Sequence, residues 1–167
     1  MLEEYNFNYI VGARIKNMQK NIKEQILNKN NYKELNSEIS IANITLDNGR
    51  KLVVTYSLKR ARKDKADREK AIKKLKDKLE KNISVKSQLS NQGYKKYLQL
   101  KSNNEESTCD LSIALNEDKI YEDSLWDGLK GLIVNKNSTL SNDEILTQYN
   151  NLWQVEESFR ITKHDLK

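Results

Sequence analysis

The 167-residue sequence has no proline, a single cysteine and a single histidine. With Cys109 alone, an internal disulfide and a zinc site built from several cysteines are both excluded. With His164 alone, we do not expect a Ser-His-Asp triad or a histidine-based metal site. Acid–base or metal chemistry would therefore depend on carboxylates, whose oxygens suit Mg²⁺ or Mn²⁺.

The sequence also lacks a long apolar run. None approaches the roughly 20 residues that span a bilayer, and the first ten residues, MLEEYNFNYI, have neither the basic nor the apolar region of a signal peptide. We therefore expect no membrane partner and a cytoplasmic location, with which a single cysteine also agrees. Hydrophobic residues make up 37% and charged residues 32%, which indicates one domain, or part of one, with a modest core.

The net charge of +6 is concentrated in one segment. Residues 57–82 contain twelve Lys or Arg and five Asp or Glu, a local charge of +7, whereas the remaining residues together carry −1. Such a local excess favours a polyanionic partner. The alternative is a solvated helix stabilised by i,i+4 pairs such as Asp64–Arg68 and Asp77–Lys81.

Hydrophobic periodicity predicts a mixed α/β chain. Strand-like patterns cover 8–14, 39–46, 51–57, 96–100, 111–115 and 129–134, and helical patterns cover 17–28, about 59–82 and 141 onward. The strands at 8–14 and 129–134 are expected to be buried. Asp47-Asn48-Gly49 lies between two of the strands and predicts a hairpin with a type I′ turn. Residues 117–125 suit a helix and a strand equally well.

The start of the last helix is well defined. Ser141 and Glu144 form a capping box, in which each side chain accepts a hydrogen bond from the other residue's backbone N–H. Leu140 and Ile145 on either side are placed to form a hydrophobic staple. A helix is therefore predicted to begin here, with no glycine or proline to interrupt it.

An acidic residue interrupts the apolar face of this helix. At 100° per residue the face contains Ile145, Tyr149, Leu152 and Phe159. Glu156 falls in its middle, where a carboxylate is costly unless it is paired, hydrogen-bonded or bound to a metal. The alternative to such a functional role is an ordinary packing helix, in which Glu156 reaches solvent at the edge of the apolar stripe.

The spacing of Tyr149, Glu156 and Lys163 fits Y-x2-R-x3-E-x6-K, with Leu152 in place of the arginine. This spacing resembles the C-terminal catalytic signature of bacterial insertion-sequence transposases of the DDE type. Three further stretches resemble segments of the same family, in the same order: YIVGARIKN (9–17), SLKRARKDKADREKAIKKL (57–75) and WDGLKGLIVN (126–135).

The resemblance implies an RNase H-like fold, with a mixed sheet, helices on both sides, and two aspartates and one glutamate that hold two divalent metal ions. Two such ions, about 3.5–4 Å apart, would activate the nucleophile and stabilise the leaving oxygen of a phosphodiester. Glu156 matches the glutamate, which makes it the expected catalytic residue and ligand of Mg²⁺ or Mn²⁺. Tyr149 and Lys163 match flanking positions that contact DNA, and Leu152 removes one phosphate contact.

The resemblance also implies a domain organisation: a partial RNase H-like core made of 8–28 and 126–167, and a β-rich insertion at about 30–115 that includes the long basic helix. The strands with the two aspartates would precede the matched region. This chain would then be the C-terminal portion of the catalytic domain, and we expect no cleavage or strand transfer by it alone.

In the family the insertion helps to hold transposon-end DNA. We therefore expect sequence-independent, salt-sensitive phosphate contacts from Lys59, Arg60, Arg62 and Lys63. The implied partners are double-stranded DNA and a second transposase protomer, with no small-molecule substrate. One alternative is a non-catalytic basic nucleic-acid-binding protein that interferes with a full-length transposase. Another is an RNA- or ribosome-associated protein, but both leave the Tyr-Glu-Lys spacing unexplained.

Five other residues fit structural roles at least as well as functional ones. Asp127, in a Trp-Asp-Gly turn, lies near the active site by the resemblance, but fits an ordinary turn residue as well. Glu122 and Asp123 fit surface charges best. Trp126 and Trp153 could stack on a flipped base, although both suit core anchors better.

Overall fold

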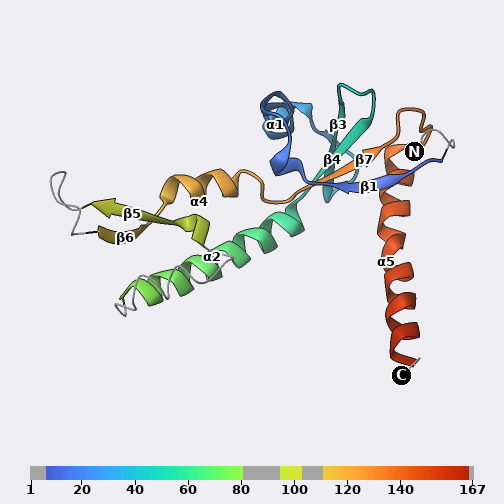
Figure 1. Cartoon of the computed structure of the whole chain (residues 1–167). Helices are drawn as coiled ribbons and strands as arrows, with labels where there is room; N and C mark the ends of the chain where they lie inside the picture. Colours follow the sequence, from blue (N-terminus) through green and yellow to red (C-terminus); the bar gives the residue numbers. More distant parts are fainter. Residues whose placement is uncertain (1–6, 81–94, 103–110, 166–167) are drawn as a thin grey trace. The chain divides into compact units, whose positions relative to one another are not determined.

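The computed structural model describes residues 7–80, 95–102 and 111–165 (Figure 1). The chain divides into two compact units. The first unit combines the residues up to Ser57 with those from Leu129 onward, and the second is Leu58–Gly128.

The first unit is built on a five-stranded sheet. In spatial order its strands are β1 (Ile10–Ala13), β7 (Leu129–Val134), β4 (Lys51–Ser57), β3 (Ile39–Thr45) and β2 (Lys33–Glu34). Every neighbouring pair is antiparallel. The other elements are η1 (Ile15–Asn17), α1 (Lys20–Leu27), η2 (Lys29–Asn31) and α5 (Asn142–Asp165).

The two faces of this sheet are covered by different helices. Because side chains alternate along a strand, Val53 and Leu132 point to one face, where they pack in a cluster with Ile145 of α5. Leu52 lies on the other face, near Ile15 of η1 around Gly131. α1 contacts β3 and contributes the buried Ile26. The core therefore lies on both sides of β4 and β7.

The hairpin of β3 and β4 is confirmed, with Thr45 opposite Lys51. Its turn differs from the prediction. The N–H of Gly49 donates to the carbonyl of Leu46 at 2.8 Å, and the N–H of Leu46 donates to the carbonyl of Arg50 at 2.9 Å. Gly49 is the last residue of this turn and has a positive φ of 78°. This is a three-residue loop with a bulge rather than a two-residue type I′ turn.

The second unit contains one long helix and a small hairpin. Its elements are α2 (Leu58–Glu80), η3 (Lys95–Tyr97), β5 (Leu98–Ser102), β6 (Leu111–Leu115) and α4 (Glu117–Ser124). β5 and β6 pair antiparallel, with Leu98 opposite Leu115. The ambiguous stretch 117–125 is a helix, because the side chain of Asn116 caps it by accepting from the N–H of Lys119 at 2.9 Å.

The structure confirms a mixed α/β chain, and two expectations differ from it. The strands 39–46 and 51–57, which the resemblance assigned to a β-rich insertion, belong to the same sheet as β1 and β7. The physical reason is the run Leu52-Val53-Val54, buried on both faces as in a central strand. β1, expected to be buried, is an edge strand whose Val11 is 44% exposed. The described pairings are all antiparallel, so an RNase H-like core stays a prediction.

Among the residues that the structure describes, none of the helices combines the length and the apolar character needed to cross a bilayer.

Candidate catalytic helix and nucleic-acid interface

The capping box at the start of α5 is confirmed. The N–H of Ser141 donates to Glu144 Oε2 at 2.7 Å, and the N–H of Glu144 donates to Ser141 Oγ at 3.3 Å. These bonds to the backbone and side chain of Ser141 lower the pKa of the Glu144 carboxyl. Ile145 is fully buried and Leu140 packs against the same cluster, as a hydrophobic staple requires. The first turn of α5 is therefore held firmly to the sheet.

Tyr149 lies one turn later, against the edge of the sheet. Its hydroxyl oxygen is 3.1 Å from the position that a Cβ would take at Gly12 of β1. The Nζ of Lys130 in β7 lies 4.2 Å from the centroid of its ring, a distance typical of a cation–π interaction. Tyr149 is thus half-buried between β1 and β7, and its expected contact with DNA stays a prediction.

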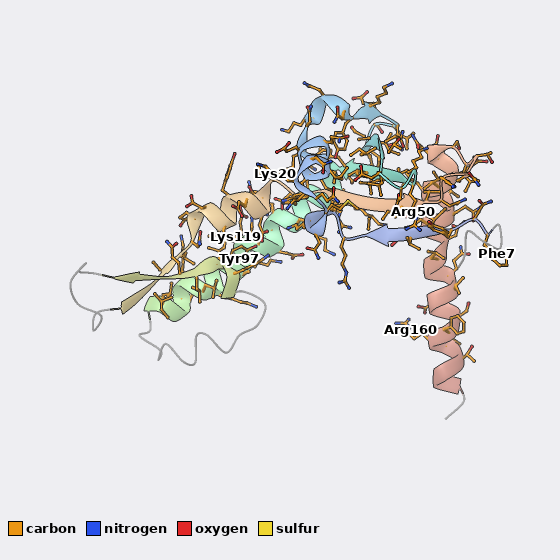
Figure 2. The ribbon with its side chains drawn as sticks, turned by 45° about the horizontal axis from the view of Figure 1, so that its top comes forward. Phe7, Lys20, Arg50, Tyr97, Lys119 and Arg160 are labelled. Carbon is orange, nitrogen blue, oxygen red and sulfur yellow. The ribbon has the colours of Figure 1, made fainter. Side chains whose placement is uncertain are left out.

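Beyond Tyr149 the apolar face of α5 is exposed. Leu152 is 45% and Phe159 is 66% exposed, whereas the sequence pattern placed both on the packing face. Arg160, at this end of the helix, points into solvent (Figure 2). The packing face therefore ends where the helix passes the edge of the sheet.

Glu156 and Lys163 lie on α5, but their side chains, like that of Trp153, are outside the described part of the structure. The helix is continuous through them. Residues seven apart on an α-helix are two turns apart and nearly in line. Tyr149, Glu156 and Lys163 therefore follow one another along a single side, about 10 Å apart.

The described side chains do not form a complete metal site. Among them, no group of three or more His, Cys, Asp or Glu residues is placed to hold an ion. Glu156, which the resemblance matches to the family's glutamate, would supply one carboxylate, and one carboxylate is too few to hold two divalent ions. The fit to the implied Mg²⁺ pair is therefore incomplete among the residues that the structure describes.

The outer surface of α2 is strongly basic. Lys59, Arg60, Arg62 and Lys63, the four predicted phosphate contacts, are all exposed. Of these, Arg60 forms an ion pair with Asp64, at 3.5 Å. The basic surface also continues along the helix beyond these four residues. Further exposed cations there are Lys65, Lys70, Lys73, Lys74 and Lys76.

The inner side of α2 is anchored by a carboxylate and an arginine. Asp64 Oδ2 accepts from the N–H of Gly128 at 3.0 Å, and Arg68 forms a hydrogen-bonded ion pair with Asp127. This hydrogen bond raises the pKa of the Arg68 guanidinium. The predicted Asp64–Arg68 pair is thus replaced by longer-range partners, and the predicted Asp77–Lys81 pair lies partly outside the described residues. The first half of α2 is therefore not the simply solvated helix of the alternative interpretation, because Asp64 and Arg68 attach one side of it to Gly128 and Asp127.

Asp127 and Asp123 have structural partners in the second unit. Asp127 pairs with Arg68, and its N–H donates to the carbonyl of Ser124 at 3.2 Å, which agrees with the turn interpretation. Asp123 is largely buried and accepts from the hydroxyl of Tyr97 at 2.7 Å while pairing with Lys96. Burial, together with the Asp123 carboxylate, raises the pKa of the Tyr97 hydroxyl. The prediction of a surface charge is wrong for Asp123.

Glu122 behaves as predicted, since it is exposed and pairs with Lys119 at 2.7 Å.

Sequence reasoning missed the cluster of Lys96, Tyr97 and Asp123 (Tyr97 is labelled in Figure 2). The tyrosine and the aspartate are 26 residues apart, and no local pattern connects them. The neighbouring Trp126 is partly buried, and its stacking on a base stays a prediction.

Comparison of the chain with protein-family models, curated proteins and solved structures finds no match.

Proposed function

We propose that this chain acts in DNA transposition, as the C-terminal portion of the catalytic domain of a DDE-type insertion-sequence transposase. The observation that supports this proposal best is the arrangement of Tyr149, Glu156 and Lys163. They follow one another at two-turn intervals on one uninterrupted helix, directly after the strand β7. The seven-residue spacing of the family's signature thus equals about two turns of the helix, which places the three residues on one side of it.

Rigid placement is the physical reason for using a helix in this role. The capping box and Ile145 hold its first turn, so later residues project from a fixed base. Glu156 would supply the third ligand of a two-metal site, and Tyr149 and Lys163 would contact DNA beside it. The aspartate ligands would come from outside this chain. By itself the chain should neither cleave DNA nor transfer strands.

The basic surface of α2 supports DNA binding. Within the described residues, Lys59, Arg62 and Lys63 are exposed without an ion-pair partner. Exposed cations on a helix contact phosphates through charge, so binding should be nearly independent of sequence and should weaken steeply with salt. The second protomer of a synaptic complex would be a further partner.

The proposal is tested first by sequencing the DNA on both sides of the reading frame. An upstream frame encoding strands with aspartate motifs, together with flanking inverted repeats, is the expected result. Unrelated upstream DNA without repeats would overturn the proposal of a working transposase portion.

DNA binding is tested by fluorescence anisotropy with a 30-base-pair duplex at low salt. Lys59→Glu combined with Lys63→Glu should weaken binding about tenfold or more, because two phosphate contacts become repulsive. The matched control is Lys20→Glu combined with Lys29→Glu, which makes the same charge change at exposed sites of the first unit. Equal losses in both variants would show that only net charge matters, and would count against a surface on α2.

The second candidate is a non-catalytic basic nucleic-acid-binding protein. The exposed cations along α2 favour it as much as they favour the first proposal, because they require no catalytic site. The sequencing experiment separates the two: duplex binding by α2 without flanking repeats would leave the non-catalytic binder as the better account.

A further inference from the structure

We propose that the free edge of β1 and the outer half of α5 together form a docking surface for β-strands of a second, different polypeptide. The occupant would be an extended segment that pairs with β1 and presents apolar side chains to α5. This inference goes beyond the proposed function and does not depend on it.

The first observation is the unprotected edge of the sheet. β1 is the last strand in the order β1-β7-β4-β3-β2, and in the described part of the chain it pairs only with β7. Its sequence, Ile10-Val11-Gly12-Ala13, has no charged residue and no proline. Edge strands of soluble proteins usually carry such features to prevent pairing with another chain. Apart from its shortness, β1 carries none of these features, and no strand among the described residues pairs with its outer side, which leaves this edge available for a further strand.

The second observation is that α5 overhangs this edge. Ile145 packs on residues of β3, β4 and β7, and one turn later Tyr149 reaches Gly12 of the edge strand. The helix then continues to Asp165, and Figure 1 shows it extending away from the sheet. At about 1.5 Å per residue the overhang is roughly 24 Å long. Since neighbouring strands lie about 4.8 Å apart, it could cover up to about five additional strands.

The third observation is the continuity of the apolar face. Leu152 and Phe159 lie seven and fourteen residues after Ile145, so all three share one side of the helix. Ile145 is fully buried, whereas Leu152 is 45% and Phe159 is 66% exposed. The exposed part is thus a direct continuation of an interface that is already used to cover strands. A sheet extended from β1 would cover it in the same manner.

A second copy of this chain fits the surface poorly. Antiparallel pairing of two β1 strands would place both copies of α5 on the same face of the joined sheet. A strand of four residues is about 13 Å long, and a helix with its side chains is about 10–12 Å wide. Two helices cannot cross so short a strand side by side. The partner must therefore contribute strands that carry no helix of their own on the face that α5 would cover.

The test is selection of binding peptides from a phage-displayed library of random 12-residue sequences against the immobilised chain. The enriched peptides should alternate β-branched or aromatic residues with polar ones. With the best synthetic peptide bound to the wild-type chain, NMR should show slower amide exchange at Ile10–Ala13. No enrichment, or enriched peptides without alternation, would overturn the proposal.

Two matched variants locate the helix half of the surface. Leu152→Glu with Phe159→Glu should weaken binding of the selected peptide at least tenfold. Asn151→Glu with Ser158→Glu, which makes the same change one residue earlier on the outer side of α5, should change it less than twofold. All four positions are exposed, so circular dichroism should show both variants folded. Equal effects in the two variants would overturn the role of α5.

The oligomeric state distinguishes a different polypeptide from a second copy of this chain. Light scattering after gel filtration should show a monomer at micromolar concentration. A dimer that Leu152→Glu with Phe159→Glu dissociates would identify a second copy as the occupant, and would overturn the assignment to a different polypeptide.

Discussion

Lys130 of β7 lies over the ring of Tyr149 in α5, with its Nζ 4.2 Å from the ring centroid. This contact, with the approach of the tyrosine hydroxyl to Gly12, joins the helix to the two outermost strands on that side of the sheet. It also means that the residue expected to contact DNA has a packing role within the chain. A loss of DNA binding after substitution of Tyr149 would therefore need a parallel measurement of stability.

The first prediction concerns this pair. Lys130→Met, which removes the charge but keeps an apolar stem, should lower the free energy of unfolding by about 0.5–1 kcal/mol. In a Tyr149→Leu background the same substitution should have a clearly smaller effect, because the ring is no longer present. Urea unfolding of the four proteins in a double-mutant cycle measures the coupling. Equal effects of Lys130→Met in both backgrounds would show that the ring and the ammonium do not interact.

The second prediction concerns Gly131 in β7. A Cβ at this position would lie 2.3 Å from Cγ2 of Ile15, well inside van der Waals contact. Gly131→Ala should therefore destabilise the chain by about 1–3 kcal/mol, as overpacking of a core does. The control is Gly49→Asn, because a Cβ at Gly49 would meet only Lys136, at an ordinary van der Waals distance of 3.8 Å, and asparagine adopts a positive φ more readily than most residues. A loss from Gly131→Ala no larger than that of the control would contradict the packing at Ile15.

The third prediction concerns the ion pair of Arg68 and Asp127, which connects residues 59 apart in the sequence. Only 11% of the arginine side chain and 17% of the aspartate side chain are exposed. Arg68→Met should cost about 1.5–3 kcal/mol, since it leaves the partner carboxylate largely buried and unpaired. Chemical denaturation of this variant and of Arg62→Met, an exposed position on the same helix, provides the comparison. The control should change stability by less than about 0.5 kcal/mol.

The fourth prediction is a pH dependence at the start of α5. The pKa of Glu144 is lowered in the folded chain by its bonds to Ser141. Its stabilising effect is therefore fully present above the pKa of an unfolded glutamate, about 4.3, and is lost as pH falls through the lower folded value. Thermal unfolding between pH 2 and 7 should show a smaller acid decrease in melting temperature for Glu144→Gln than for the wild type.

The control for this effect is Glu24→Gln, an exposed glutamate on α1, whose acid profile should follow that of the wild type. Ser141→Ala removes the other half of the capping box and should cost about 1 kcal/mol at pH 7. If Glu144→Gln leaves the acid profile unchanged, the capping box does not contribute to the pH dependence.

Several parts of the fold could be predicted from the sequence because their signals are local. The capping box at Ser141 and Glu144, the strand at 129–134 and the helix from Leu58 follow from residues within a few positions of one another. The error at the hairpin was also local. Asn48-Gly49 suited two turn types, and the choice depended on which backbone groups pair, Leu46 with Arg50.

The candidate site was predictable only in part. The spacing of Tyr149, Glu156 and Lys163 along a helix follows from helical periodicity alone. The place where the apolar face of that helix stops being buried does not, because it depends on where the helix crosses β1. The partners of Asp64 and Arg68 could not be predicted either. These partners, Gly128 and Asp127, lie in the turn before β7, some 60 residues away along the chain.

The sequence by itself determined the short-range structure of this protein: where helices begin, which stretches are extended, and which segment concentrates positive charge. Hydrogen bonds and hydrophobic periodicity over a few residues are sufficient for that. Only the tertiary structure decided that β4 is a central strand, that Arg68 pairs with Asp127, and that Leu152 and Phe159 remain exposed on α5. Each of these depends on contacts between distant segments, whose free energy is set by the complete packing arrangement and not by any local pattern.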